Sequence, residues 1–237
     1  MKLLKTAVLA AIMTSSAIAS FAQSAEEIVT KHIEATGGEA NWKKVNAIKM
    51  TGSMTIQGME MPIIITTVNK KAMRMDITIM GTSNYQIITD KEGWGFFPIQ
   101  QQQKPEPMTA DQVKESQDQL LVQDEFLNYK KDGSKIEFLG KDDMEGTEVL
   151  KLKLTDKDGK EKTFFFDASN YYILRQSQKV NADGKETDVV VNYSNFQKLP
   201  AGITFPMTIE QEQTGPINFT SVEVNPNIDE SIFKPAQ

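Results

Sequence analysis

The chain contains no cysteine and only one histidine, His32, among its 237 residues. The absence of cysteine excludes disulfides, zinc–thiolate centres, thiol nucleophiles and a lipid-modified N-terminal cysteine. A single histidine is too few for a histidine-rich metal site or for a catalytic histidine pair. Thiolate and multi-histidine chemistry is therefore excluded from the outset.

Short catalytic motifs are also missing. The sequence has no Gly-x-Ser-x-Gly, no His-Glu-x-x-His and no glycine-rich phosphate loop after a strand. The segment Asp156-Lys157-Asp158-Gly159 resembles part of a calcium loop, but it lacks the later acidic positions, and a hairpin turn explains it. We therefore expect that the protein is not an enzyme, and the sequence assigns no catalytic residue, no metal ligand and no cofactor.

Positive charge is scarce as well. There are 26 basic and 32 acidic residues, so the formal net charge is −6. Nucleic acids and anionic membrane surfaces attract basic proteins, so the acidic balance argues against both as partners. The remaining composition is that of a globular domain.

Residues 1–22 have the three parts of a secretory signal peptide. Two lysines form the basic start, an apolar run covers residues 7–13, and Ser20 and Ala22 supply the small residues that signal peptidase reads. We expect cleavage after Ala22, which removes two lysines and no acidic residue and leaves residues 23–237 as a single domain with a charge of −8. No stretch approaches the ~18 apolar residues of a membrane span, so we expect a periplasmic protein that does not span the membrane. A core of this size makes disulfides unnecessary in that compartment.

Two helices and a series of strands are expected. The helices cover residues 24–35 and 109–128, and the capping residues Ser24 and Thr109 are each followed three positions later by Glu or Gln. Elsewhere apolar and polar residues alternate, which is typical of antiparallel strands with one solvated face. Turn signals separate these runs and give about eleven strands. His32 lies on or beside the apolar stripe of the first helix, and we interpret it as part of a helix–sheet contact rather than as a ligand or base.

Methionine is unusually frequent in the early strands. The pairs Met59 with Met61 and Met73 with Met75 place two thioethers on one face of a strand, and thioethers can bind Cu(I). No cysteine or well-placed histidine completes such a site. We therefore favour the interpretation that the methionines line an adaptable apolar surface.

Aromatic residues form a second informative set. Residues 164–166 are three consecutive phenylalanines, so their strand is apolar on both faces and must be covered on each side by a helix or by a ligand. Trp94 and Phe96 lie on another strand. An ordinary barrel core and a ligand cavity explain this set equally well.

Four segments form a recognisable combination. They are the short first helix ending at Gly37-Gly38, the stretch 42–52 that leads into the strands, the acidic turn followed by tryptophan and proline at 90–98, and the C-terminal stretch 193–235. Together they resemble the LolA/LolB-like periplasmic superfamily, which includes proteins labelled outer-membrane lipoprotein-sorting protein. The resemblance covers nearly all of residues 23–237.

The resemblance implies a mainly β (α+β) fold, a half-open antiparallel β-barrel of about eleven strands wrapped around helices. It also implies a hydrophobic cavity between sheet and helices. The implied function is a periplasmic carrier or binding protein for a hydrophobic ligand, either a lipid or lipoprotein acyl chains, in outer-membrane lipoprotein sorting. Its partners would be that ligand or an acylated protein, together with envelope membrane proteins that donate or accept it.

On this interpretation the helix over residues 109–128 is a lid, and Arg74, between two methionines, points to solvent. The expected cavity walls are Met73, Met75, Ile77, Ile79, Trp94, Phe96, Leu120, Leu121, Leu150, Leu152, Leu154, Phe205 and Met207. Two alternatives stay open. One is a non-catalytic interaction or sensor domain of the same fold with no carried ligand, and the other, less favoured, is a methionine-based Cu(I) binder.

Overall fold

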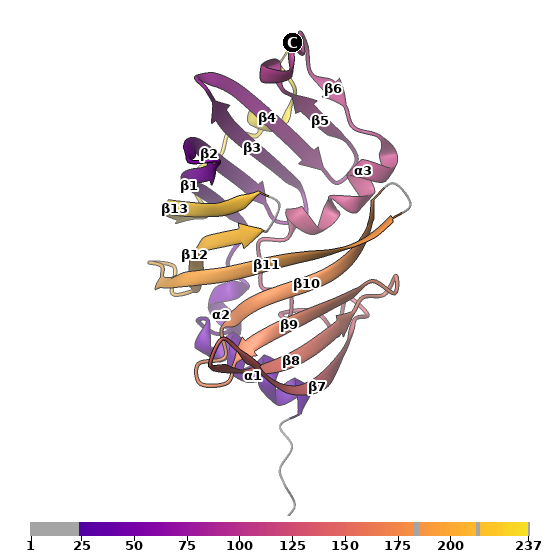
Figure 1. The fold of residues 1–237 in the computed structure, drawn as a ribbon, viewed down its shortest axis with the longest axis vertical. Coiled ribbons are helices and arrows are strands. Elements are labelled where there is room, and N and C mark those ends of the chain that lie inside the picture. Colours follow the sequence, from indigo (N-terminus) through magenta and orange to yellow (C-terminus); the bar gives the residue numbers. More distant parts are fainter. Residues whose placement is uncertain (1–23, 183–184, 212–213, 237) are drawn as a thin grey trace, which may run out of the picture.

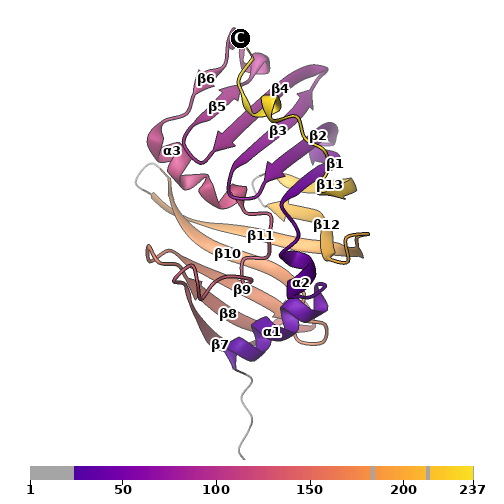
Figure 2. The same ribbon diagram turned by 180° about the vertical axis from the view of Figure 1, so that it is seen from behind.

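The computed structural model describes residues 24–182, 185–211 and 214–236. The expected signal peptide and its cleavage site after Ala22 lie outside the described residues. One sheet runs through the whole molecule, with a few short helices against it (Figures 1 and 2). The strands are β1 (Ala47–Ile56), β2 (Met59–Val68), β3 (Ala72–Ile79), β4 (Thr82–Thr89), β5 (Gly93–Phe96), β6 (Glu106–Pro107), β7 (Lys135–Met144), β8 (Thr147–Thr155), β9 (Glu161–Asp167), β10 (Ile173–Ala182), β11 (Lys185–Lys198), β12 (Thr204–Gln211) and β13 (Gly215–Val224). The helices are α1 (Ala25–Ala35), α2 (Glu39–Trp42) and α3 (Ala110–Glu115), with 3-10 helices η1 (Pro98–Gln100), η2 (Gln117–Leu120) and η3 (Glu230–Phe233).

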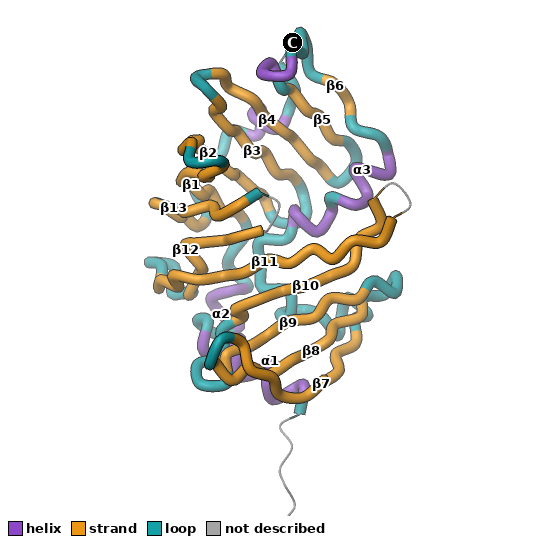
Figure 3. Tube along the Cα trace, in the orientation of Figure 1, coloured by secondary structure: helices purple, strands orange, loops and turns teal. Residues whose placement is uncertain are grey.

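The sheet is open and antiparallel. Its strand order in the described residues is β6-β5-β4-β3-β2-β1-β13-β12-β11-β10-β9-β8-β7, so β6 and β7 are edges at opposite ends of the molecule (Figure 3). The pairing of β1 with β13 joins the first half of the chain to the second. The predicted half-open antiparallel β-barrel is confirmed as an open antiparallel sheet, which has thirteen strands in the described residues rather than about eleven. The two-residue β6 is too short to show periodicity in the sequence.

The first predicted helix is confirmed. The Ser24 side chain accepts a hydrogen bond of 3.1 Å from the Glu27 backbone N–H and starts α1. The apolar stripe of α1, which includes Ile28 and Ile33, packs on leucines of β8 and phenylalanines of β9. The helix has 11 residues, and no helix in the described part of the chain is long and apolar enough to cross a membrane.

The second predicted helix is wrong beyond Leu120. The capping box at Thr109 is present, but α3 ends at Glu115 and η2 ends at Leu120. Residues 121–128, called the strap below, continue without a helix. Their polar groups bond to distant elements instead, for example the Val122 N–H to the Asn69 side chain at 3.1 Å. These tertiary contacts outweigh the local helical preference that the sequence pattern indicated.

The sheet has an inner face, against which α1 and the strap pack, and an opposite outer face. Figure 2 shows α1 and α2 in front of the strands that hide them in Figure 1. Leu150, Leu152 and Leu154 of β8 face inward beneath α1. In the other half of the sheet, Leu120 packs inward on Met73 and Ile88.

The C-terminal segment packs on the outer face of β3, β4 and β5. Phe233 contacts Tyr85 and Ile87, and Trp94 and Phe96 pack against the same cluster. Arg74 is held there rather than extending freely into solvent: its guanidinium bonds Asp76 and donates to the Ile232 carbonyl at 2.9 Å.

A close backbone contact at Gly52 stabilises the junction between β1 and β13. A Cβ atom built there would lie 2.1 Å from the Asn218 carbonyl oxygen, next to a register shift in this strand pair. We expect Gly52→Ala to lower the free energy of unfolding by about 2 kcal/mol, because the rigid backbone opposite must move. Urea unfolding measures this, with Ser53→Ala in the same strand as the control. Equal stability of the two variants would contradict the expectation.

Candidate functional site

Two adjacent cavities that share part of their lining lie on the inner face, against the strap. The larger one, called the polar chamber, has a volume of about 500 Å³ and lies over β10 and β11. The smaller one, called the apolar chamber, has a volume of about 210 Å³ and lies between α1, α2 and strands β9 to β12. The residues that line both are Leu121, Gln123, Glu125, Gln176 and Tyr193.

Half of the apolar side chains in the wall of the apolar chamber are aromatic. Its apolar side chains are Trp42, Leu121, Val122, Phe164, Ile173, Phe196, Phe205 and Pro206. Phe196 stacks on Tyr172, with ring centroids 4.7 Å apart. Beyond Phe196 and Thr204, which belong to both, a further hollow opens at the corner between α1 and β12.

His32 and Asp124 form a buried pair where the strap meets α1. The His32 Nε2 lies 2.7 Å from the Asp124 Oδ2, and the Nδ1 lies 2.7 Å from the Tyr171 carbonyl oxygen. A carbonyl can only accept, so the Nδ1 must carry a hydrogen. The ring also packs edge-on against Phe126 and Phe166. The expectation that His32 lies at a helix–sheet contact agrees with this position, but its bond to the strap had no signal in the sequence.

The charge of Asp124 controls the ionisation of His32. Burial disfavours the imidazolium, but the Asp124 charge and hydrogen bond, with the Tyr171 carbonyl, outweigh it and raise the pKa of His32. The pair therefore favours an imidazolium bonded to a carboxylate.

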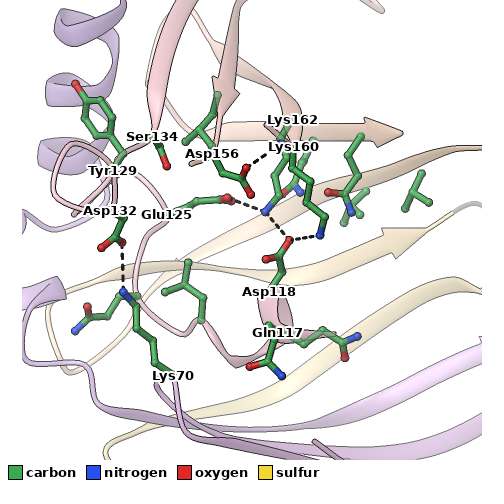
Figure 4. Close-up of a pocket in the computed structure, with 18 of the residues that line it drawn as sticks. Lys70, Gln117, Asp118, Glu125, Tyr129, Asp132, Ser134, Asp156, Lys160 and Lys162 are labelled. Carbon is green, nitrogen blue, oxygen red and sulfur yellow. Dashed lines mark hydrogen bonds and ion pairs between the residues drawn. The ribbon is translucent and has the colours of Figure 1, made fainter. Parts of the chain in front are cut away.

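The polar chamber contains a chain of ion pairs. Lys162 of β9 lies 2.7 Å from the Glu125 carboxylate and 3.2 Å from that of Asp118, and Lys160 reaches Asp118 at 3.6 Å. Figure 4 shows the Asp118 and Glu125 carboxylates pointing toward Lys162 from opposite sides. The side chain of Lys162 is 10% exposed and that of Glu125 is 25% exposed, so this pair is the least solvated part of the chain of charges.

Burial acts on both partners of that pair. It raises the pKa of the Glu125 carboxyl, although Lys162 opposes the shift. Burial also disfavours the charged form of Lys162, but Glu125 and Asp118 outweigh it and raise its pKa. Consecutive strap residues thus bond in two directions, Asp124 to α1 and Glu125 to β9, and fix the strap between the two chambers.

Neutral polar groups complete the polar chamber. Six glutamines line it: Gln117, Gln119, Gln123, Gln176, Gln178 and Gln211. Burial strongly raises the pKa of the Tyr193 phenol, so the hydroxyl stays protonated and donates to the Gln176 Oε1 at 3.2 Å. The cavity is therefore more polar than the sequence analysis anticipated for this face.

Three of the thirteen predicted wall residues line these chambers. Leu121 belongs to both, Leu154 to the polar chamber and Phe205 to the apolar chamber. Leu150 and Leu152 are fully buried beneath α1 and the strap, as parts of the core. Leu120 and Met207 are also buried.

The other predicted wall residues divide between the two faces. Met75, Ile77 and Ile79 form an inward apolar cluster with Met54 and Met61, and Met73 packs under Leu120. Trp94 and Phe96 lie on the opposite face, under the C-terminal segment, so they cannot share one cavity with Met73. The cause is the sheet register, in which Trp94 is opposite Ile87, which is opposite Arg74. The alternation of apolar and polar residues shows which side chains of one strand share a face. It does not show which side chains of the neighbouring strand lie on that same face.

No protein-family model and no curated protein matches the sequence. Solved structures do match. A domain from Vibrio parahaemolyticus, described as that of an outer membrane lipoprotein-sorting protein, has a TM-score of 0.56 and 12% identity over 87% of this chain and 94% of that chain. A LolA superfamily protein from Nitrosomonas europaea has a TM-score of 0.54 and 13% identity over 89% and 97%. A DUF1329 family protein from Desulfovibrio piger has a TM-score of 0.50 and 10% identity over 90% and 98%.

These matches cover most of the chain, and they agree with the resemblance found in the sequence. Identities of 10–13% establish a likeness of fold only. The open antiparallel sheet, with helices and a strap on its inner face, has the LolA-like fold.

Proposed function

We propose that the protein is a periplasmic binding protein that carries a hydrophobic ligand on the inner face of its sheet and performs no catalysis. The observation that carries this proposal is the apolar chamber, which is lined by aromatic side chains and bounded by the strap. Transfer of a methylene group from water into such a chamber contributes roughly 0.8 kcal/mol, so a short acyl chain suffices for useful affinity.

Three further observations support the proposal. The solved structures described as LolA superfamily and lipoprotein-sorting proteins share this fold, which favours a lipid or the acyl chains of a lipoprotein as cargo. The N-terminal residues have the pattern of a signal peptide, which favours export. His32 has both ring nitrogens bonded to protein groups, which favours a structural role over a catalytic one.

Native mass spectrometry of protein purified from a bacterial periplasm without detergent tests the proposal directly. We expect a bound mass, and an organic extract of the same sample should contain a lipid or acylated species. A ligand-free mass, together with no binding of added lipids, would contradict the proposal and would favour a non-catalytic interaction domain of the same fold.

A charge placed in the apolar chamber should weaken this binding. We expect Phe196→Asp to weaken binding of the uncharged fluorescent probe N-phenyl-1-naphthylamine by about tenfold or more, because a carboxylate in that wall loses its hydration or draws water in. Fluorescence titration measures the affinity. The matched control is Phe165→Asp, since Phe165 lies on the outer face near Lys151 and Arg175. Equal affinities of the two variants would contradict the placement of the ligand.

A further inference from the structure

The relative sizes of the two chambers indicate an amphipathic ligand. The polar chamber is more than twice as large as the apolar chamber, about 500 Å³ against about 210 Å³. Leu121, Gln123 and Glu125 of the strap line both, so the two chambers share a boundary. A molecule that spans this boundary would have a bulky polar head and a smaller apolar part.

The charges of the polar chamber do not favour an anionic head. Each of its three lysines lies within 3.6 Å of a carboxylate of the same chamber. Four carboxylates line it, from Asp118, Glu125, Asp132 and Asp156, so the balance is slightly negative. A phosphate or carboxylate that bonds to one of these lysines would lie close to the carboxylate already paired with it, and the two anions would repel each other.

Neutral hydrogen-bonding groups, in contrast, are available there. The side chains of Gln119, Gln178 and Gln211 line the polar chamber and make no hydrogen bond to any described residue. Gln176 accepts from Tyr193 through its oxygen, and its amide nitrogen makes no bond within the described residues. Each amide offers a donor and an acceptor, which is also what a ligand hydroxyl group offers, so the two pair without any net charge.

The paired charges can also serve hydroxyl groups. A carboxylate that accepts one lysine proton keeps further lone pairs, and an ammonium keeps further protons, so a hydroxyl can bond to either without breaking the pair. Glu125 and Tyr193 line both chambers, and Lys162, which is paired with Glu125, lines the polar chamber. The donors and acceptors thus begin where the apolar wall ends.

We propose that the polar chamber binds the uncharged, polyhydroxylated head of an amphiphile, such as a glycoside of a fatty alcohol or a glycolipid, whose apolar chain enters the apolar chamber. This inference rests on the proposed function and specifies the chemical class of its ligand. Free amides on β10 and β12 bond the hydroxyl groups, and the aromatic wall receives the chain.

Three compounds with the same chain and different heads test the assignment. They are octyl-β-D-glucoside, octyl phosphate and nonanoate, whose carboxylate also carries an octyl chain, each titrated into the purified protein by calorimetry below the concentration at which it forms micelles. We expect the glucoside to bind about tenfold more tightly than either anion, since two or three additional hydrogen bonds suffice for that difference. Gln178→Met and Gln211→Met should each remove most of that preference while leaving nonanoate binding unchanged.

The control variant is Gln197→Met, at an exposed position of β11 outside both chambers. It should keep the preference for the glucoside. Equal affinities for the three compounds, tighter binding of an anion, or an unchanged preference in Gln178→Met and Gln211→Met would overturn the assignment of the head group but leave the proposed function intact. Failure of all three octyl compounds to bind would overturn the proposed function itself.

Discussion

Replacing Asp124 by alanine is expected to lower the free energy of unfolding by about 3 kcal/mol, the low end of the range for a broken buried ion pair. The value lies at the low end because the imidazole of His32 can release its proton instead of remaining as an isolated charge. The Nε2 then has no partner, and the Phe126 N–H loses its acceptor at 2.9 Å. Urea unfolding at pH 6 measures the loss, and a loss below about 1 kcal/mol would contradict a buried pair.

The same pair makes stability depend on pH with a predictable sign. Asp124 raises the pKa of His32 in the folded protein above its unfolded value of about 6.5. The folded state therefore binds more protons between these two values, and stability falls as pH rises through that window. The stabilisation is complete below pH ~6.5 and is lost above the folded pKa. His32 is the only histidine in the chain, so His32→Gln should remove this dependence.

The conservative variant Asp124→Asn should invert the sign. An asparagine amide can donate to the Nε2 of a neutral imidazole while its oxygen still accepts from the Phe126 N–H. Without the carboxylate, burial lowers the pKa of His32, so the variant loses stability as pH falls below ~6.5. Unfolding curves of both proteins from pH 5 to 8 should therefore have opposite slopes. Parallel slopes would show that the pair does not carry the pH dependence.

Replacing Lys162 by methionine is the second change with a large expected effect, about 3 kcal/mol of destabilisation. It leaves the Glu125 carboxylate, 25% exposed, without its cation and close to Asp118. Protonation of Glu125 relieves this repulsion, because its folded pKa rises further above the unfolded value. The deficit should consequently be smaller at pH 5 than at pH 8.

A double variant separates the ion pair from the packing around it. Lys162→Met with Glu125→Gln removes both charges and should recover most of the stability lost in Lys162→Met alone. Denaturant unfolding of the wild type, both single variants and the double variant completes the cycle. Additive losses would mean that the two side chains do not interact, contrary to their separation of 2.7 Å. Lys141→Met, at an exposed pair with Glu148, is the matched control and should cost under about 1 kcal/mol.

Local sequence patterns correctly predicted the helices and strands that are specified by residues close together in the chain. Ser24 and the stripe beginning at Ile28 define α1, and period-two alternation defines strands such as β3 and β8. The helix predicted over residues 109–128 is wrong beyond Leu120, because contacts between residues far apart in the chain decide the structure there. Its apolar spacing fits a helix, but Asp124 and Glu125 bond to residues 92 and 37 positions away, and these bonds hold the strap in a non-helical conformation.

The candidate site was harder to predict because its residues come from many elements. The sequence predicts Phe205 and Leu121 as apolar residues on suitable elements, but it carries no signal that singles out the glutamines. Gln178 and Gln211 are ordinary polar positions in alternating strands, and the register of β10, β11 and β12 brings them to one cavity. The prediction of Trp94 as a cavity residue rests on aromatic composition. Strand register decides the face on which Trp94 lies, and it cannot be read from the sequence.

The sequence by itself excluded thiolate and multi-histidine chemistry and determined the strands and the first helix. It also showed a resemblance that identifies the fold. These properties depend on composition and on contacts between near neighbours, which repeat at fixed spacing along the chain. The tertiary structure alone decided which face each strand presents, where the strap lies, and that His32 meets Asp124. Those outcomes depend on strand register and on pairing between charges far apart in the chain, and neither leaves a periodic trace in the sequence.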